Sequence, residues 1–366
     1  MKSQKFYLVI LAWLLFGAMA AVSSCSKSSD PATPAINADK TKLTALIDSV
    51  TAVHAAAVEG TKPGTYAAGS KATLKTSIDL AVTTKADAGA TQATVNTAEA
   101  SLRRAAKTFQ NSLIQEVSAA NLVAQWKFAG NANDATANAN NGTLKTGPAG
   151  PPPTFPTPPA DGTVLPVLVA DRFGRANQAY EFNGGAYIEV PYKVTLNPQA
   201  ITISAWVKPF DSNPDNYIVS LNRWTGYKFQ LQSARKPFLT VTTTNPSNAI
   251  SDRDAETGIV AANVWSHVTS SYVDGTMKFY INGALVKTWT DVSGSLKAIP
   301  QQVPLCIGQQ LPKDIYNSAP TAGQPRDYFQ YYSPAFFKGQ MDDIRIYNRA
   351  LTDAEVQSIF TIENTL

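Results

Sequence analysis

Residues 337–356 read Phe-Lys-Gly-Gln-Met-Asp-Asp-Ile-Arg-Ile-Tyr-Asn-Arg-Ala-Leu-Thr-Asp-Ala-Glu-Val, the order of a strand, a corner and a short helix. The strand shows two alternating sets of side chains, Met341, Asp343, Arg345 and Tyr347 against Asp342, Ile344 and Ile346. The first set predicts a polar face, on which Asp343 and Arg345 stand close enough to pair. The second combines apolar side chains with one carboxylate. Thr352 and Glu355 have the spacing of a capping box, which predicts a helix start.

This order resembles the laminin-G-like, concanavalin A-like jelly rolls of bacterial surface proteins. Further motifs of that family follow in sequence order: Leu122–Phe128 with Gly130-Asn131-Ala132, Ala179–Gly184, Trp265–Val268, Tyr280–Gly283 and Cys306-Ile307-Gly308. Asp274-Gly275 and Asn282-Gly283 are typical of two-residue hairpin turns. The resemblance implies an all-β fold over residues 120–362, a two-sheet antiparallel jelly-roll sandwich preceded by a small α module. Residues 147–166 include eight prolines, and we expect this segment to be a surface loop within the jelly roll.

The N-terminus has the features of a targeting signal. Lys2 and Lys5 precede an apolar run over 6–22, which is shorter than the roughly 20 residues of a membrane helix. Val22-Ser23-Ser24-Cys25 resembles a bacterial lipobox, so residues 1–24 are expected to be a lipoprotein signal peptide and Cys25 the lipidated residue. Residues 25–38 then form a flexible tether. An ordinary signal peptide and a retained single-span anchor are the alternatives.

A lipid on Cys25 implies attachment to a membrane of the cell envelope. Lys27 and Asp30 resemble the export signals of Bacteroidetes-type surface lipoproteins, which favours the outer membrane and surface exposure. Cys306 would then be the only free thiol, so no intramolecular disulfide is expected. The formal charge of +4 falls to +2 when Lys2 and Lys5 are removed. No run of basic residues occurs, which argues against a nucleic-acid partner.

Residues 39–117 have the apolar spacing of helices. Leu43, Leu46, Ile47 and Val50 follow the i, i+3, i+4, i+7 pattern. Two similar patterns follow, one that starts at Ser70 and ends before Gly89, and one from Val95 to Leu113. The prediction is a three-helix module. Its Gly-Thr-Tyr around Tyr66 resembles the FIVAR-type modules of bacterial surface proteins, which implies a spacer or a weak sugar-binding module.

Two loops carry the aromatic and polar side chains that sugar binding needs, because rings stack on the apolar face of a pyranose. One loop holds Arg223, Trp224 and Tyr227. The other, an insertion between Gly308 and Phe337, holds Tyr316, Arg326, Asp327, Tyr328, Tyr331 and Tyr332. We expect these residues to bind a ligand. The alternative is that the insertion packs its own rings on the sandwich.

Calcium is implied by the family resemblance, since such jelly rolls often join their first and last strands through this ion. The oxygen donors at the matching places are Asn131, Asp134, Asn138 and Asp342. If calcium is present, its role is expected to be structural. The alternative is that Asp134 and Asn138 form turns and that Asp342 accepts from backbone amides.

Catalysis has little support in the sequence. A retaining glycosidase needs two carboxylates about 5 Å apart, and residues 252–256, Asp-Arg-Asp-Ala-Glu, are similar in spacing to the Glu-x-Asp-x-Glu strand of the beta-glucanase group. The first position departs from that pattern, and the flanking residues predict a solvated loop. The expected function is therefore glycan binding by a non-catalytic cell-surface lipoprotein. A glycoside hydrolase or lyase on the same fold and a protein-binding adhesion module remain the alternatives.

Overall fold

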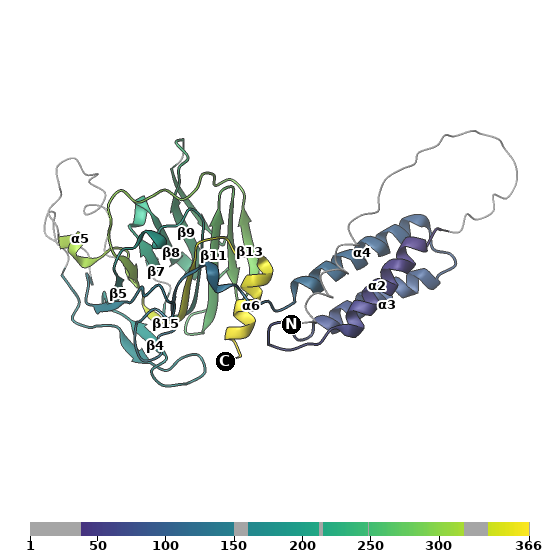
Figure 1. Ribbon diagram of the computed structural model, residues 1–366, viewed down its shortest axis with the longest axis horizontal. Coiled ribbons are helices and arrows are strands. Elements are labelled where there is room, and N and C mark those ends of the chain that lie inside the picture. The colour runs from purple at the N-terminus through teal and green to yellow at the C-terminus, as the bar shows by residue number, and fades with distance from the viewer. Residues whose placement is uncertain (1–37, 150–159, 212–214, 248, 318–335, 366) are drawn as a thin grey trace, which may run out of the picture.

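The computed structural model describes residues 38–149, 160–211, 215–247, 249–317 and 336–365, which form a three-helix module and a two-sheet sandwich (Figure 1). The predicted signal peptide, Cys25 and nearly all of the tether lie outside these residues, so the lipid anchor stays a prediction. Within the described ranges, none of the helices has the length and apolar character needed to cross a membrane.

The helical module has the predicted architecture. Its helices are α2 (Thr41–Ala56), α3 (Ser70–Ala86) and α4 (Gln92–Asn111). Leu43, Leu46, Ile47 and Val50 are buried in its core, as their spacing predicts. Tyr66, in the loop between α2 and α3, stacks on Phe109 with ring centroids 4.2 Å apart. The predicted three-helix region is therefore confirmed.

The sandwich consists of two antiparallel sheets, which confirms the predicted fold class. The eight-stranded sheet has the order β13-β12-β11-β6-β15-β4-β3, with β1 paired to β15 beside β4. The seven-stranded sheet has the order β10-β9-β8-β7-β14-β5-β2. The strands of the first sheet are β1 (Leu122–Trp126), β3 (Val167–Val169), β4 (Ala179–Phe182), β6 (Ile201–Pro209), β11 (Ser266–Val273), β12 (Thr276–Ile281), β13 (Ala284–Trp289) and β15 (Gly339–Tyr347). Those of the second are β2 (Thr143–Lys145), β5 (Tyr187–Val190), β7 (Asp215–Leu221), β8 (Tyr227–Gln232), β9 (Lys236–Thr242), β10 (Ile250–Asp254) and β14 (Leu305–Ile307).

Strand β15 departs from the predicted alternation. Asp343 has a φ of 44°, and the register of β15 against β6 shifts between Asp342 and Arg345. This β-bulge places Met341 and Ile344 on the same, core-facing side. Asp343 pairs with Arg172 at 2.9 Å rather than with Arg345. The predicted faces and the predicted Asp343–Arg345 pair are therefore wrong, because a single inserted residue changes the side of the sheet to which its neighbours point.

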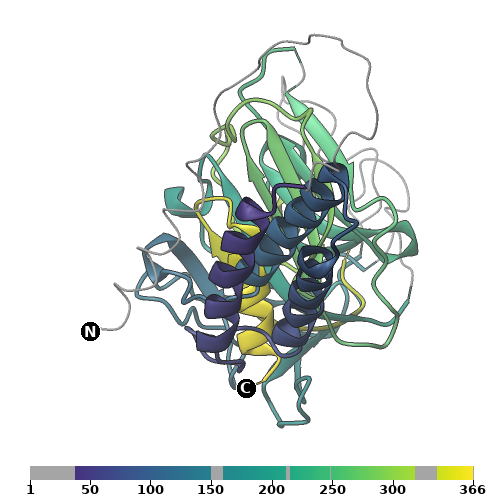
Figure 2. The ribbon, with the colours of Figure 1, turned by 90° about the vertical axis from the view of Figure 1, so that its right-hand side faces the viewer.

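The C-terminal helix α6 (Asp353–Glu363) begins as predicted. Thr352 and Glu355 form a complete capping box, in which each side chain accepts from the other residue's backbone amide. Val356 and Ile359 pack on Tyr280 and Tyr347 in a small core outside the eight-stranded sheet. Figure 2 shows the three helices in front of α6 and the sandwich.

Candidate ligand-binding face

The outer face of the seven-stranded sheet carries a continuous row of polar side chains. In β8, Tyr227, Phe229 and Leu231 enter the core between the sheets, so Lys228 and Gln230 point outward. The register then fixes their neighbours. One row of strand partners crosses the sheet. From β10 to β14 it consists of Asp252, Thr240, Lys228, Ser220 and Cys306. A second row joins Tyr217, Gln230 and Phe238. We call this set the polar face: Tyr217, Ser220, Lys228, Gln230, Phe238, Thr240 and Asp252.

Lys228 is the cation at the centre of the polar face. Its side chain is 4% exposed, and its Nζ donates to the Tyr217 hydroxyl at 3.2 Å. The same Nζ lies 5.3 Å from the centre of the Tyr217 ring and 5.6 Å from that of Phe238. Burial lowers the pKa of Lys228 to about 8, although Asp252 and Asp215 oppose the shift. Lys228 is therefore a buried basic group packed between two aromatic rings.

Gln230 and Thr240 connect this interior to an exposed margin. The Nε2 of Gln230 donates to Asp215 at 3.2 Å, and the hydroxyl of Thr240 donates to Asp252. Asp215 and Asp252 are exposed, whereas Gln230 is 1% exposed. Among the described residues, the Oε1 of Gln230 has no hydrogen-bond partner. An unpaired buried acceptor is costly unless a ligand or water hydroxyl reaches it.

The insertion after β14 begins over this same face. The Ser220 hydroxyl donates to the Gln310 carbonyl at 2.7 Å, and the amide of Lys313 donates to the Tyr187 hydroxyl at 3.1 Å. Arg223 is 2% exposed and donates to the Gln310 side chain at 3.0 Å. The start of the insertion, including helix α5 (Lys313–Asn317), is therefore next to strands β5 and β7. Two parts of the predicted ligand region, the Arg223 loop and the stem of the insertion, are brought together.

Comparison with known proteins agrees with this architecture. Residues 182–357 match a family model, Laminin_G_3, described as the concanavalin A-like lectin/glucanases superfamily. Residues 182–357 are a concanavalin A-like domain. No curated protein sequence matches the chain.

Solved structures similar to the chain include domain 4 of AbnA, a GH43 extracellular arabinanase from Geobacillus stearothermophilus, in complex with arabinotriose. It is 19% identical, with a TM-score of 0.43, over 65% of this chain and 98% of that one. The binding domain of Paraclostridial Mosquitocidal Protein 1 is 18% identical, with a TM-score of 0.43, over 66% and 52% of the chains. A structure of botulinum neurotoxin type C, whose cell entry depends on two ganglioside molecules, is 16% identical, with a TM-score of 0.38, over 66% and 50%. The chain thus spans about half the length of these two toxin chains.

Tyr227 is not available to a ligand in the concanavalin A-like domain. It is fully buried between the sheets, and its hydroxyl donates to the Leu196 carbonyl at 2.8 Å. Burial raises the pKa of Tyr227 well above its usual range. The prediction that Tyr227 binds a ligand is therefore wrong, because its side chain is buried between the two sheets. It failed because the segment after Thr225 is a strand, β8, whose first residue points into the core.

Most of the other predicted ligand contacts stay untested. Arg326, Asp327, Tyr328, Tyr331 and Tyr332 lie outside the described residues. The structure describes only the backbone of Trp224 and Tyr316, not their side chains. The Trp224 backbone is in a short 3-10 turn, and the Tyr316 backbone is in α5. The polar-face residues were missed at the sequence level. The alternation Tyr227-Lys228-Phe229-Gln230-Leu231 was the signal that could have found them.

The predicted calcium ligands have other partners. Both carboxylate oxygens of Asp134 are occupied, since they accept from the amides of Gln125, Thr136 and Asn140 at 2.9 Å. Asn138 donates to strand carbonyls of β1, and Asn131 accepts from the Asn133 amide in its own turn. Asp342 is 2% exposed and pairs with Arg172. A guanidinium at Asp342 and amides around Asp134 do not fit a calcium ion, so these four residues do not form the predicted site.

The segment 252–256 is not the solvated loop that its flanks predict. Ile250–Asp254 is the edge strand β10, which pairs with β9 in five consecutive positions. Asp254 accepts from the Glu256 amide at 2.8 Å, and Glu256 pairs with Lys287 at 2.6 Å. These acidic residues therefore have structural partners in a turn and on β13, an edge strand of the other sheet. The loop prediction failed because an edge strand exposes one face and tolerates charged residues.

A second buried polar group lies on the opposite sheet, beneath α6. Arg172 pairs with Asp342 and Asp343, and its guanidinium lies 4.4 Å from the Trp206 ring. Arg345 forms an ion pair with Glu363 at 2.6 Å. Burial and the neighbouring Asp343 raise the pKa of Asp342 to about 8. We call Arg172, Asp342, Asp343, Arg345 and Glu363 the charge cluster. Its contacts join α6 and the segment before β4 to β15, which is a structural task.

Proposed function

We propose that the concanavalin A-like domain binds a glycan, without catalysis, at the polar face. The observation that carries the proposal is the buried acceptor Oε1 of Gln230, which has no partner among the described residues and lies in the row between Tyr217 and Phe238. A sugar has hydroxyl groups that can donate to the Gln230 oxygen, and an apolar ring face that can pack on the Tyr217 and Phe238 rings.

The exposed margin sets the direction of approach. Asp215 and Asp252 present carboxylates to solvent and are bonded to Gln230 and Thr240 behind them. Carboxylates accept strongly from sugar hydroxyls, because hydrogen bonds to a charged group contribute about 1.5–3 kcal/mol. The sugar would contact these two residues first and reach the Gln230 acceptor behind them.

The proposed setting is the cell envelope. The apolar run over 6–22 and the lipobox-like Val22-Ser23-Ser24-Cys25 support a lipid anchor at Cys25, and Lys27 and Asp30 support display at the outer-membrane surface. Intact-mass analysis of membrane-extracted protein tests the anchor directly. A mass equal to residues 25–366 plus acyl groups is expected, and a mass without acyl groups would contradict it.

A glycan-array screen of residues 26–366 tests the binding. Asp252→Asn and Gln230→Leu should each weaken binding to any retained glycan by about 10-fold or more, as the loss of one charged or buried hydrogen bond implies. Asp79→Asn is the matched control, because Asp79 is an exposed carboxylate on α3 of the helical module. Equal binding by all variants would reject the polar face. Release of a cleaved product would reject the non-catalytic part, and binding to no glycan would favour a protein ligand.

A further inference from the structure

The segment that connects the helical module to the sandwich is held at its start, its middle and its end. Residues 112–114 belong to the module, because they pair with the loop between α2 and α3. The amide of Ile114 donates to the Thr65 carbonyl at 2.8 Å, and the Ile114 carbonyl accepts from Gly64 at 2.8 Å. The amide of Ala67 donates to the Ser112 carbonyl at 2.9 Å. Ile114 itself is 1% exposed. The chain therefore leaves α4 in a fixed direction.

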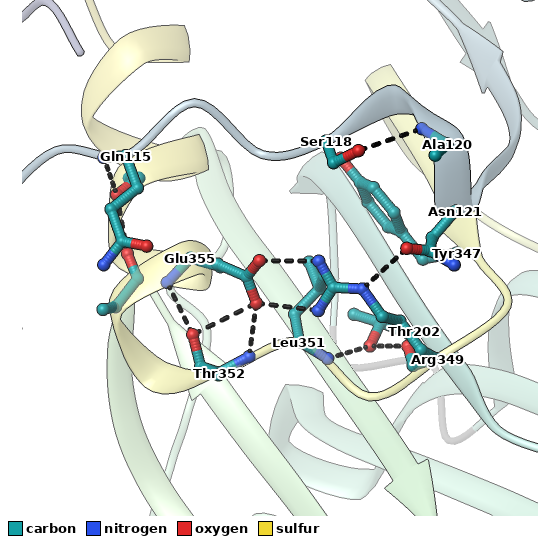
Figure 3. A network of polar contacts seen from close by, with 12 residues as sticks. Gln115, Ser118, Ala120, Asn121, Thr202, Tyr347, Arg349, Leu351, Thr352 and Glu355 are labelled. Carbon is teal, nitrogen blue, oxygen red and sulfur yellow. Dashed lines mark hydrogen bonds and ion pairs between the residues drawn. The ribbon is translucent and has the colours of Figure 1, made fainter. Parts of the chain in front are cut away.

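The next residues contact α6. The amide of Gln115 donates to the Ser358 hydroxyl at 2.8 Å, as the dashed contact at Gln115 in Figure 3 shows. Val117 packs against the small core that Tyr347, Leu351 and Val356 help to form. The connecting segment therefore contacts both α6 and the small core between α6 and the eight-stranded sheet.

The end of the segment is bonded to the corner that follows β15. The Asn121 side chain donates to Asn348 at 3.0 Å and accepts from Arg349 at 3.2 Å. The Arg349 guanidinium also pairs with Glu355 of α6 at 2.6 Å. Figure 3 shows the Asn121–Arg349 and Arg349–Glu355 contacts as one network that includes Thr202 of β6. The last residues before β1 are thus tied to both the corner and the helix.

Helix α6 is itself fixed to the sheet at both ends. At its start, Asp353 accepts from Lys278 at 2.7 Å and from Tyr280 at 2.8 Å, both residues of β12. At its end, the Glu363 carboxylate accepts from Trp206 at 2.8 Å, and the Glu363 carbonyl accepts from Arg172 at 2.7 Å. Any motion of the module relative to the sandwich would break contacts on α6 or on residues 112–121.

We infer that residues 112–121, which we call the joint, lock the three-helix module onto α6 in one orientation, so that the module is a rigid spacer for the sandwich. A free, flexible linker of ten residues would have an r.m.s. end-to-end distance of about 16–19 Å and no fixed direction. The joint removes this freedom. The 20 residues of α4 then extend away from the sandwich by about 30 Å. The inference does not depend on which ligand the polar face binds.

Spin-label distance measurements test the joint in residues 26–366. Labels are placed at Asp79→Cys on α3 and Val194→Cys on the sandwich, both exposed positions. One narrow distance distribution is expected. The Gly-Ser variant replaces residues 115–118 by Gly-Ser-Gly-Ser and adds Asn121→Ala and Ser358→Ala, so that the contacts of the joint with α6 and the corner are removed. It should broaden the distribution several-fold, while circular dichroism confirms that helices and strands are retained. Glu116→Ala is the control, because this exposed side chain lies within the joint, and it should keep the narrow distribution.

Two results would overturn the inference. The first is a distribution in the unmodified joint that is as broad as in the Gly-Ser variant, since the module would then already move freely. The second is a distribution that stays narrow in the Gly-Ser variant, since the orientation would then not depend on the contacts of the joint.

Discussion

The substitution Arg172→Met should destabilise the sandwich strongly, because it leaves buried carboxylates without their cation. The Arg172 side chain is 3% exposed, as is that of Asp342, and that of Asp343 is 14% exposed. Removal of one partner from a buried ion pair costs about 3–5 kcal/mol. Methionine keeps much of the packing on Trp206, so the loss measures mainly the charge. For a domain of this size the melting temperature should fall by about 6–20 °C.

Urea unfolding followed by near-ultraviolet circular dichroism measures this loss in the sandwich. The matched control is Lys75→Met, which removes an exposed i,i+4 pair with Asp79 and should change stability by at most about 0.5 kcal/mol. The double variant Arg172→Met with Asp342→Asn should recover part of the loss, since it removes a stranded carboxylate. A loss below about 1 kcal/mol for Arg172→Met would refute the reasoning that this cluster is a buried, mutually dependent set of charges.

Three other predictions concern His267, the N-cap of α6 and calcium. Burial, followed by the charge of Arg345, lowers the pKa of His267 to about 3, so the unfolded chain binds a proton below about pH 6.5 that the folded chain does not. The free energy of unfolding of the wild type should therefore fall as the pH is lowered from 6.5 toward 3, and more steeply than that of His267→Phe. The difference between the two slopes should reach about 1.4 kcal/mol per pH unit. Equal slopes in thermal melts would contradict this. Thr352→Ala should destabilise the docked α6 by about 1 kcal/mol in urea, because it removes the N-cap, whereas no loss would show that the capping box contributes nothing. A calcium chelator should leave the melting temperature unchanged, because Asp134 and Asp342 have other partners, and a drop of several degrees would show that calcium binds.

The fold was predictable because its signals are local. Hairpin turns at Asp274-Gly275 and Asn282-Gly283, helix periodicity before residue 117 and the capping box at Thr352 depend only on neighbouring residues. The β-bulge at Asp343 was not predictable in this way. It is fixed by the pairing of β15 with β6 and by Arg172, which lies 171 residues away in the sequence. Contacts of that range leave no periodic trace.

The candidate site was predictable only in part. The aromatic insertion after β14 was predicted to bind a ligand, and that prediction stays untested, although the start of the insertion at Gln310 lies against β7. The polar row itself depends on the register between β7, β8, β9 and β10, which decides that Lys228, Thr240 and Asp252 are neighbours. Tyr227 shows the same limit. Its residue type suits a sugar, but its position in the alternation puts it in the core.

Hydrogen–deuterium exchange of residues 26–366, with and without a glycan retained on the array, tests the central claim most directly. Binding at the polar face should slow exchange in β7, β8, β9 and β10, over residues 215–254, and leave α2, α3 and α4 unchanged. Protection confined to the helical module, or to strands of the eight-stranded sheet, would contradict the account.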